Sequence, residues 1–249
     1  MKHIIDLQGK NILVTGAGSG IGRETAIVAS DLGARMILVD ISEEGLSDTL
    51  SQIKSGSDVS YSLDLSDSEA VARLIDDAVS VVGSIHGLVH CAGISSRKPL
   101  NVLSKKGFGK VMEVNFFSFV DLVRQLSKKK NLADGGSIVV MSSISSVRGY
   151  KAKSEYCVSK ASVDAFVRCM ALELAGRRIR INSVMAAEVL TPLAMKAREI
   201  NLMVGADDFH APLGPSDPYE VANTIAFLLS DATKTITGTS ILIDGGACV

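Results

Sequence analysis

The chain has 249 residues, a formal net charge of −1, 47% apolar residues and four cysteines. Balanced charge argues against nucleic-acid or anionic-membrane partners, no apolar stretch approaches the length of a membrane span, and no signal peptide precedes the first predicted strand. The cysteines lack metal-ligand spacing and are few for a disulfide framework. We therefore expect that the protein binds no metal and is located in the reducing cytoplasm.

A strand, a glycine-rich turn and a helix open the chain. The apolar run 11–16 ends in TGAGSGIG, residues 15–22, and a helical pattern follows it. In a dinucleotide-binding opening, Gly16 permits the tight turn, Gly20 lets the backbone approach a pyrophosphate, and Gly22 lets the helix pack on the strand. An ordinary glycine turn is the alternative, and the flanking strand and helix disfavour it.

The second predicted strand, 35–40, ends at Asp40, where a carboxylate can accept hydrogen bonds from the adenosine ribose of NAD. Asp40 could instead cap the next helix, but Ser42 is better placed for that cap, which leaves Asp40 free for the ribose. A carboxylate there would repel a 2′-phosphate, and neither Ser19 nor Ile41 supplies a cation to bind one. The sequence therefore predicts NAD rather than NADP.

Short apolar runs alternate with longer amphipathic stretches through the rest of the chain. The runs lie at 11–16, 35–40, 87–93, 136–143, 178–184 and 240–246, and the longest helical patterns lie at 68–83 and 154–176. This alternation predicts an α/β protein: a single-domain Rossmann fold over 1–249, with a doubly wound parallel sheet flanked by helices on both faces.

Tyr156 and Lys160 stand four residues apart on the last of these helices, so their side chains share one face. A phenol is a poor acid–base catalyst near neutrality, and a neighbouring cation stabilises the phenolate and lowers its pKa. The spacing alone is weak evidence, and its context gives it weight.

These motifs together resemble the short-chain dehydrogenase/reductase family over essentially the whole chain. TGAGSGIG is similar to the family's TGxxxGxG motif, and Tyr156 to Lys160 is similar to its Tyr-x-x-x-Lys motif. Ser143 has the family's thirteen-residue separation from the tyrosine, and ILIDGG at 241–246 resembles its final strand.

The resemblance implies a catalytic group of four residues. Tyr156 would be the general acid–base, Ser143 would hold the reacting oxygen, and Lys160 would lower the pKa of Tyr156 and bind the nicotinamide ribose. Asn115 would complete a proton relay through water near Lys160. Ser145 is a possible substrate contact.

The resemblance also implies a set of cofactor-binding residues around the glycine motif and the strand ends. They are Gly16, Gly18, Ser19, Gly20, Ile21, Gly22, Asp40, Ile41, Asp64, Leu65, Cys91, Ala92, Gly93, Tyr156, Lys160, Val189 and Thr191.

Two places depart from the family pattern. His90-Cys91 stands where Asn-Asn is usual, and we expect His90 to be a structural partner that replaces a lost sheet-bracing bond. Ala186-Ala187 stands where Pro-Gly is usual, so the loop beside the nicotinamide could differ in shape.

The substrate is the least defined part of the prediction. The segment at about 188–216 would close over it, and Glu188, Arg97, Lys98 and Arg148 hint at a sugar, polyol or acidic ketone, although ordinary surface charges would explain them equally well. The chain looks most like the 3-oxoacyl-(acyl-carrier-protein) reductase-like members.

Three functional readings remain open on these residues. The first is an NAD(H)-dependent enzyme acting on a secondary alcohol or ketone, with a sugar or polyol dehydrogenase as its variant. The second is a non-catalytic NAD-binding regulatory protein, and the third is epimerisation or dehydration on the same scaffold. The family implies a homotetramer or homodimer through the helices 115–128 and 156–174, with 238–249 as a further contact.

Overall fold

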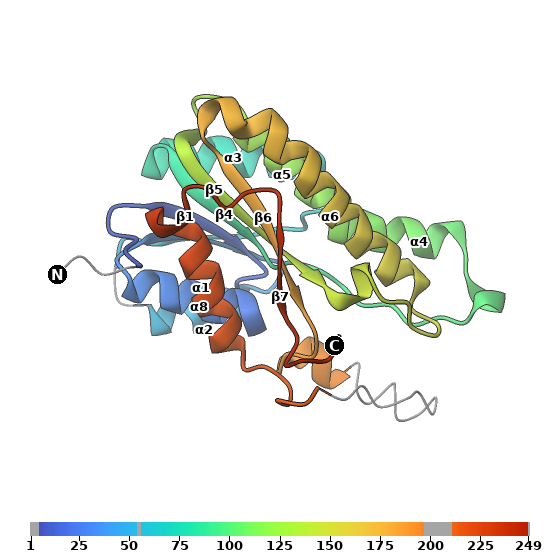
Figure 1. Cartoon of the computed structure of the whole chain (residues 1–249). Coiled ribbons are helices and arrows are strands. Elements are labelled where there is room, and N and C mark those ends of the chain that lie inside the picture. The colour runs from blue at the N-terminus through green and yellow to red at the C-terminus, as the bar shows by residue number, and fades with distance from the viewer. Residues whose placement is uncertain (1–4, 54–55, 197–210, 249) are drawn as a thin grey trace.

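A computed structural model describes residues 5–53, 56–196 and 211–248 (Figure 1). Seven parallel strands form one sheet in the order β3-β2-β1-β4-β5-β6-β7. The strands are β1 (Asn11–Thr15), β2 (Arg35–Asp40), β3 (Val59–Ser62), β4 (Ile85–His90), β5 (Leu132–Ser143), β6 (Arg180–Ala186) and β7 (Ser240–Ile243). The order reverses between β1 and β4, and ligands of such sheets bind where the carboxyl ends of the strands meet this reversal.

Helices cover both faces of the sheet, as Figure 1 shows. One face carries α1 (Gly20–Asp31), α2 (Glu43–Gln52) and α8 (Pro218–Leu229); the other carries α3 (Ser68–Val82), α5 (Ser118–Leu126) and α6 (Ser154–Leu174), with α4 (Lys105–Met112) leading into α5. The predicted single α/β domain with a doubly wound parallel sheet is confirmed. No helix in these described ranges is both long enough and apolar enough to cross a bilayer.

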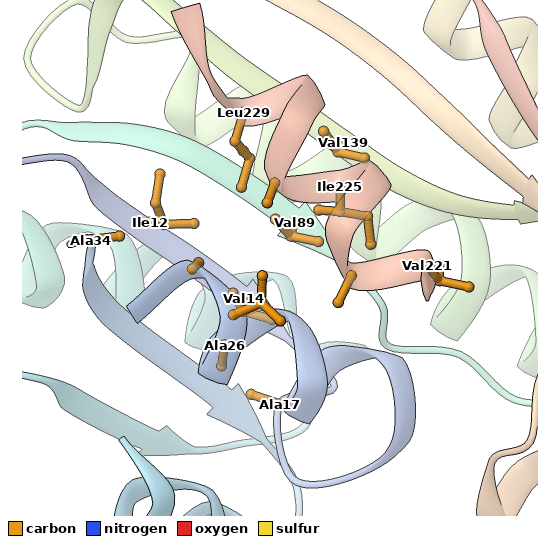
Figure 2. Close-up of a cluster of buried hydrophobic side chains, with 14 of the residues drawn as sticks. Ile12, Val14, Ala17, Ala26, Ala34, Val89, Val139, Val221, Ile225 and Leu229 are labelled. Atoms are coloured by element: carbon orange, nitrogen blue, oxygen red, sulfur yellow. The ribbon is translucent and has the colours of Figure 1, made fainter. Parts of the chain in front are cut away.

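Alternation along the strands divides the core into two layers. On β1, Ile12 and Val14 face one layer and Leu13 faces the other. Figure 2 shows the first layer, in which Ile12 and Val14 lie beside Ile225 and Leu229 of α8. Both faces of β1 are therefore fully buried, which explains why its sequence is a continuous apolar run.

Some helices begin at other residues than the sequence pattern predicts. Helix α1 begins at Gly20, inside the glycine motif, because the turn itself forms the first helical residues. Helix α2 begins as expected: the Ser42 hydroxyl accepts a hydrogen bond from the Gly45 N–H at 3.0 Å. Before α5, residues Glu113–Phe117 form a π-helical segment that periodicity alone does not reveal.

Candidate active site

The glycine motif forms a close turn between β1 and α1. A Cβ atom on Gly22 would lie 2.1 Å from the Gly16 carbonyl oxygen, so the helix approaches the strand only because residue 22 has no side chain. Gly20 has a φ of +52°, and a Cβ atom there would lie 3.1 Å from a methyl carbon of Thr191. The motif therefore brings the start of α1 against the segment that follows β6.

The N-terminus of α1 differs from those of α2, α3, α4 and α8. Those helices have side-chain caps from Ser42, Asp67, Ser104 and Asp217, whereas the Ser19 side chain makes no cap bond and the first turn of α1 carries no acidic residue. The first backbone N–H groups and the positive end of the helix dipole are thus available to an anion. This end of α1 fits the pyrophosphate of a dinucleotide.

Asp40, at the end of β2, is held against the glycine motif rather than left free as the sequence suggested. Its two carboxylate oxygens accept hydrogen bonds from the Gly18 N–H and the Ser42 N–H, both at 2.9 Å. Each oxygen keeps a second lone pair, so the carboxylate can still accept a ribose hydroxyl. The two backbone bonds fix where that acceptor lies.

Three further predicted cofactor residues surround the same corner. Ile41, directly after Asp40, is 71% exposed, and Leu65 is buried in the same apolar layer as Ile37 and Val39 of β2. Asp64 accepts bonds from the backbone and hydroxyl of Ser66, which lower the pKa of its carboxyl group. An exposed apolar side chain beside fixed carboxylates suits the flat, polar-edged ring of an adenine.

Tyr156 and Ser143 meet at the carboxyl edge of the sheet. Ser143 is the last residue of β5, Tyr156 lies in the first turn of α6, and the Ser143 side chain acts to lower the pKa of the Tyr156 phenol. Ser142 points to the other side of the strand, where its hydroxyl donates to Asp164 at 2.9 Å. Alternation along β5 thus distinguishes the two serines, and the Ser145 N–H donates to Ser143 Oγ at 3.2 Å.

Lys160 is buried one turn after Tyr156. Its ammonium donates to the Met141 carbonyl at 2.8 Å and lies 5.7 Å from the centre of the Tyr156 ring. Burial lowers the pKa of Lys160 to about 8, and nearby Cys91 and Asp164 oppose that change. Burial likewise raises the pKa of Tyr156, against the lowering effect of the Ser143 bond. The net change in the Tyr156 pKa is therefore an increase, contrary to the expected lowering by Lys160.

Asn115 lies at the centre of the π-helical segment and is completely buried. Its amide oxygen accepts from the Ile94 N–H at 2.8 Å, and its amide nitrogen donates to the Ile94 carbonyl and to Ser159 Oγ, both at 3.0 Å. Asn115 thereby fixes the loop after β4 against α6. The same loop carries Gly93, where a Cβ atom would lie 3.8 Å from Lys160 Nζ.

His90 braces the sheet, as its position at a strand end suggested. Its Nδ1 lies 2.8 Å from the Thr15 hydroxyl, and its ring stacks on Phe119 with centroids 5.3 Å apart. Burial lowers the pKa of His90 to about 3, with a further lowering by Lys160, so the ring is neutral. Burial raises the pKa of the Cys91 thiol to about 12, and the Gly16 turn packs directly on the backbone of Cys91 and Ala92.

The Ala186-Ala187 departure leaves a regular strand end. Ala186 pairs with both Ser143 and Ile243, and the Ala187 N–H donates to the Ile243 carbonyl at 3.0 Å. Val189 then forms a bridge with Ser216, which brings the two ends of the segment 188–216 together. Residues 197–210 of the predicted substrate loop lie outside the described residues.

Two buried carboxylates on α6 went unnoticed in the sequence. Glu155 accepts hydrogen bonds from the Ser96 hydroxyl and from Lys98 Nζ, the latter at 3.4 Å, and Asp164 accepts from Ser142 and from Ser183 at 2.7 Å. Their only sequence signal is an acidic residue one position before Tyr156 and another four positions after Lys160. Within the described ranges, no group of three His, Cys, Asp or Glu residues could hold a metal ion.

Comparison with known proteins places this geometry in a family. Residues 16–248 match the family described as enoyl-(acyl carrier protein) reductase. The chain is 34% identical to a 3-oxoacyl-(acyl-carrier-protein) reductase of Thermotoga maritima, over 98% of this chain and 99% of that protein. It is 33% identical to the L-xylulose reductase of Mus musculus, over 97% and 98%, and 30% identical to an NAD-dependent glycerol dehydrogenase of Listeria innocua, over 97% and 94%.

Solved structures agree with these sequence relatives. The crystal structure of levodione reductase superposes with a TM-score of 0.89 at 28% identity, covering 96% of this chain and 98% of that one. A short-chain dehydrogenase/reductase of Brucella melitensis reaches 0.90 at 27% identity, with all of both chains covered. The chain therefore belongs to the short-chain dehydrogenase/reductase family, as an oxidoreductase that acts on CH–OH or C=O groups with a nicotinamide cofactor.

Proposed function

We propose that the chain is an NAD(H)-dependent enzyme that interconverts a secondary alcohol and a ketone, with Tyr156 as the general acid–base. The observation that carries the choice of NAD is Asp40, whose carboxylate is fixed by Gly18 and Ser42 at the ribose end of the nucleotide region. An NADP 2′-phosphate would bring its negative charge against that carboxylate, and like charges in close contact are unfavourable.

The residues named above would hold the cofactor along the carboxyl edge, from Asp40 and Ile41 at the adenosine end, through the N-terminus of α1, to Lys160. When bound, the nicotinamide accepts or supplies the hydride. In the reductive direction, Tyr156 donates its phenolic proton to the carbonyl oxygen, and the Ser143 hydroxyl donates a hydrogen bond to the same oxygen. In the oxidative direction, Tyr156 accepts the proton of the alcohol.

Lys160 has two roles in this proposal. Its ammonium holds the nicotinamide ribose hydroxyls and stabilises the Tyr156 phenolate when the proton leaves. Asn115 holds the loop 93–94 and Ser159 in place beside it, so that water can reach Lys160 and restore the proton. Val189 and Thr191 would contact the carboxamide, and the segment 188–216 would close over the substrate.

Substrate chemistry is tested by initial rates on two classes of compound. An acetoacetyl thioester with NADH tests the 3-oxoacyl branch, which the Thermotoga maritima relative supports; glycerol and xylitol with NAD test the polyol branch, which the Listeria innocua relative supports. Each reaction is repeated with NADP or NADPH. Turnover that prefers NAD(H) supports the proposal, and turnover only with the phosphorylated cofactor would overturn its cofactor part.

We further propose a cytoplasmic homotetramer or homodimer. Apolar side chains remain exposed on the helices expected to associate: Phe117 is 44% exposed, Val158 45% and Leu172 83%; on β7, Leu242 is 48% exposed. Association would cover this apolar surface. Light scattering after size exclusion tests the assembly, and a monomeric mass would contradict it.

A further inference from the structure

Lys153 is a cation that the proposed reaction does not use. It is the N-cap residue of α6 and lies one turn before Tyr156, whereas Lys160 lies one turn after it. Residues three, four and seven positions apart share a helix face, so Lys153, Tyr156 and Lys160 form one stripe along α6. Lys160 belongs to the cofactor side of the phenol, and Lys153 lies on the opposite side.

The ring of Tyr150 positions Lys153 and a second cation. Lys153 Nζ lies 5.3 Å from the ring centre, and Arg148 Cζ lies 5.6 Å from it. Arg148 also donates from Nη1 to the Ala247 carbonyl at 3.2 Å. Contacts with one aromatic ring thus gather positive charge where the loop 147–153 enters α6.

A third cation, Arg97, comes from the loop after β4. The Lys98 N–H donates to the Ala152 carbonyl at 2.7 Å, which joins this loop to the one that carries Lys153. The side chains on either side of Arg97, Ser96 and Lys98, both contact the buried carboxylate of Glu155.

Arg97 itself is an electrostatic neighbour of Lys153. Burial, together with the positive charge of Arg97, lowers the pKa of Lys153. The contacts of Glu155 with Ser96 and Lys98, and the Lys98–Ala152 backbone bond, hold the loop of Arg97 against the loop of Lys153.

Charge at this point is not balanced within the described residues. Glu188 and Cys157 favour the charged form of Lys153, but burial and Arg97 oppose it more strongly. None of the ion pairs within the described ranges includes Arg97 or Lys153. An anionic group bound between them would relieve their repulsion and accept charge-assisted hydrogen bonds from both.

We propose that Arg97 and Lys153 form a subsite for an anionic group of the substrate, a carboxylate or a phosphate, one helical turn from the Tyr156 phenol. This inference rests on the proposed function and narrows it: the substrate is a hydroxy or keto compound that carries a negative charge. A neutral sugar or polyol would leave the repulsion between the two cations in place.

Matched substrate pairs test the subsite. 3-Hydroxybutyrate is compared with butane-1,3-diol, and 4-hydroxypentanoate with pentane-1,4-diol, so that only the charged end differs. Acetoacetyl-CoA is compared with the neutral acetoacetyl thioester of N-acetylcysteamine, which separates phosphate from carboxylate as the source of the anion. The enzymes are the wild type, Arg97→Gln, Lys153→Gln and, as a matched control, Lys129→Gln, which removes an exposed charge near the amino end of β5.

We expect the wild type to prefer the charged member of a pair by about tenfold or more in kcat/KM. Arg97→Gln and Lys153→Gln should each reduce that preference by about tenfold, mainly through KM, and Lys129→Gln should leave it unchanged. A purely structural effect would lower both members of a pair alike. Equal use of charged and neutral substrates by the wild type, or an unchanged ratio in Lys153→Gln, would overturn the inference.

A binding measurement distinguishes failure of the subsite from failure of the proposed reaction. If no compound turns over with either cofactor, thermal stabilisation by acetoacetate and by butan-2-one is measured in the presence of NADH. Stabilisation by acetoacetate alone, lost in Lys153→Gln, would support the subsite while the proposed reaction fails. Equal shifts with both ligands, or none, would overturn the subsite as well.

Discussion

The proposed nucleotide site and the proposed substrate subsite of this protein are formed by different kinds of chemical group. On the nucleotide side, backbone groups do most of the positioning: Gly22 lets α1 approach β1, and the Gly18 N–H holds Asp40. In the proposed substrate subsite, two cations come from separate loops, and the charge of Arg97 contributes to lowering the pKa of Lys153. The first kind of site requires particular residue types at fixed spacings, whereas the second requires only that two loops come together.

The largest effect should come from the closest backbone approach. Gly22→Ala would place a Cβ atom 2.1 Å from the Gly16 carbonyl oxygen, so α1 must move and the pyrophosphate site with it. We expect NADH affinity to fall by about a hundredfold or more in a fluorescence titration, if the variant folds at all. Gly109→Ala is the matched control, because nothing lies within 4 Å of that position; it should keep NADH affinity. An unchanged affinity in Gly22→Ala would contradict this description of the turn.

Asp40 should decide which cofactor is used. Asp40→Ser removes the charge that would meet a 2′-phosphate, and we expect the ratio of kcat/KM for NAD over NADP to fall by about tenfold or more. Ser42→Ala is the control, since it removes the cap bond to Gly45 while keeping the carboxylate. In that variant the free energy of unfolding should fall by about 1 kcal/mol, and the cofactor preference should stay the same. A preference that survives Asp40→Ser would refute the NAD assignment.

His90 should make stability depend on pH. Its folded pKa of about 3 lies below the ordinary value of 6.5, so between these values the unfolded chain binds a proton that the folded chain does not. The free energy of unfolding therefore decreases as the pH falls through this window, by about 2 kcal/mol between pH 7.5 and pH 5. Urea unfolding of wild type and His90→Asn at both pH values measures the difference. Equal pH dependence in the two proteins would show that His90 is not buried and neutral.

Lys160 should produce the smallest effect, on cofactor affinity at alkaline pH. Because burial lowers its pKa to about 8, the ammonium is lost as the pH rises above that value. NADH affinity should then weaken by about threefold to tenfold between pH 7 and pH 9, in line with the loss of one charge-assisted bond. Lys160→Met should show weaker binding already at pH 7 and little further change. A wild-type affinity that is flat over this range would place the ribose away from Lys160.

The parallel sheet and the glycine motif could be predicted because physics limits the residues that can form them. Buried parallel strands must be apolar on both faces, and the Gly22 position tolerates no side chain, so both leave clear patterns. The family's thirteen-residue separation from Tyr156 singles out Ser143 among its neighbours, and the Ser142 hydroxyl is engaged elsewhere, with Asp164.

The remaining features depend on tertiary contacts that one sequence does not reveal. The π-helical segment at Asn115 has no periodicity of its own, and the hydrogen bonds of the Asn115 amide with Ile94 and Ser159 join residues far apart in the sequence. In the sequence, Glu155 looks like an ordinary acidic residue in the first turn of a helix. Its contacts with Ser96 and Lys98 are seen only in the folded chain. Burial of the Tyr156 phenol, which raises its pKa, likewise becomes visible only when β5 and α6 are brought together.

The central claim is that Tyr156 transfers the proton while the nucleotide side binds its cofactor independently. The most direct measurement compares wild type and Tyr156→Phe for NADH affinity and for turnover of a substrate that the wild type accepts. We predict that affinity stays within about threefold, because phenylalanine keeps the ring, while turnover falls by about a hundredfold or more. Turnover in Tyr156→Phe within about threefold of the wild type would contradict the claim.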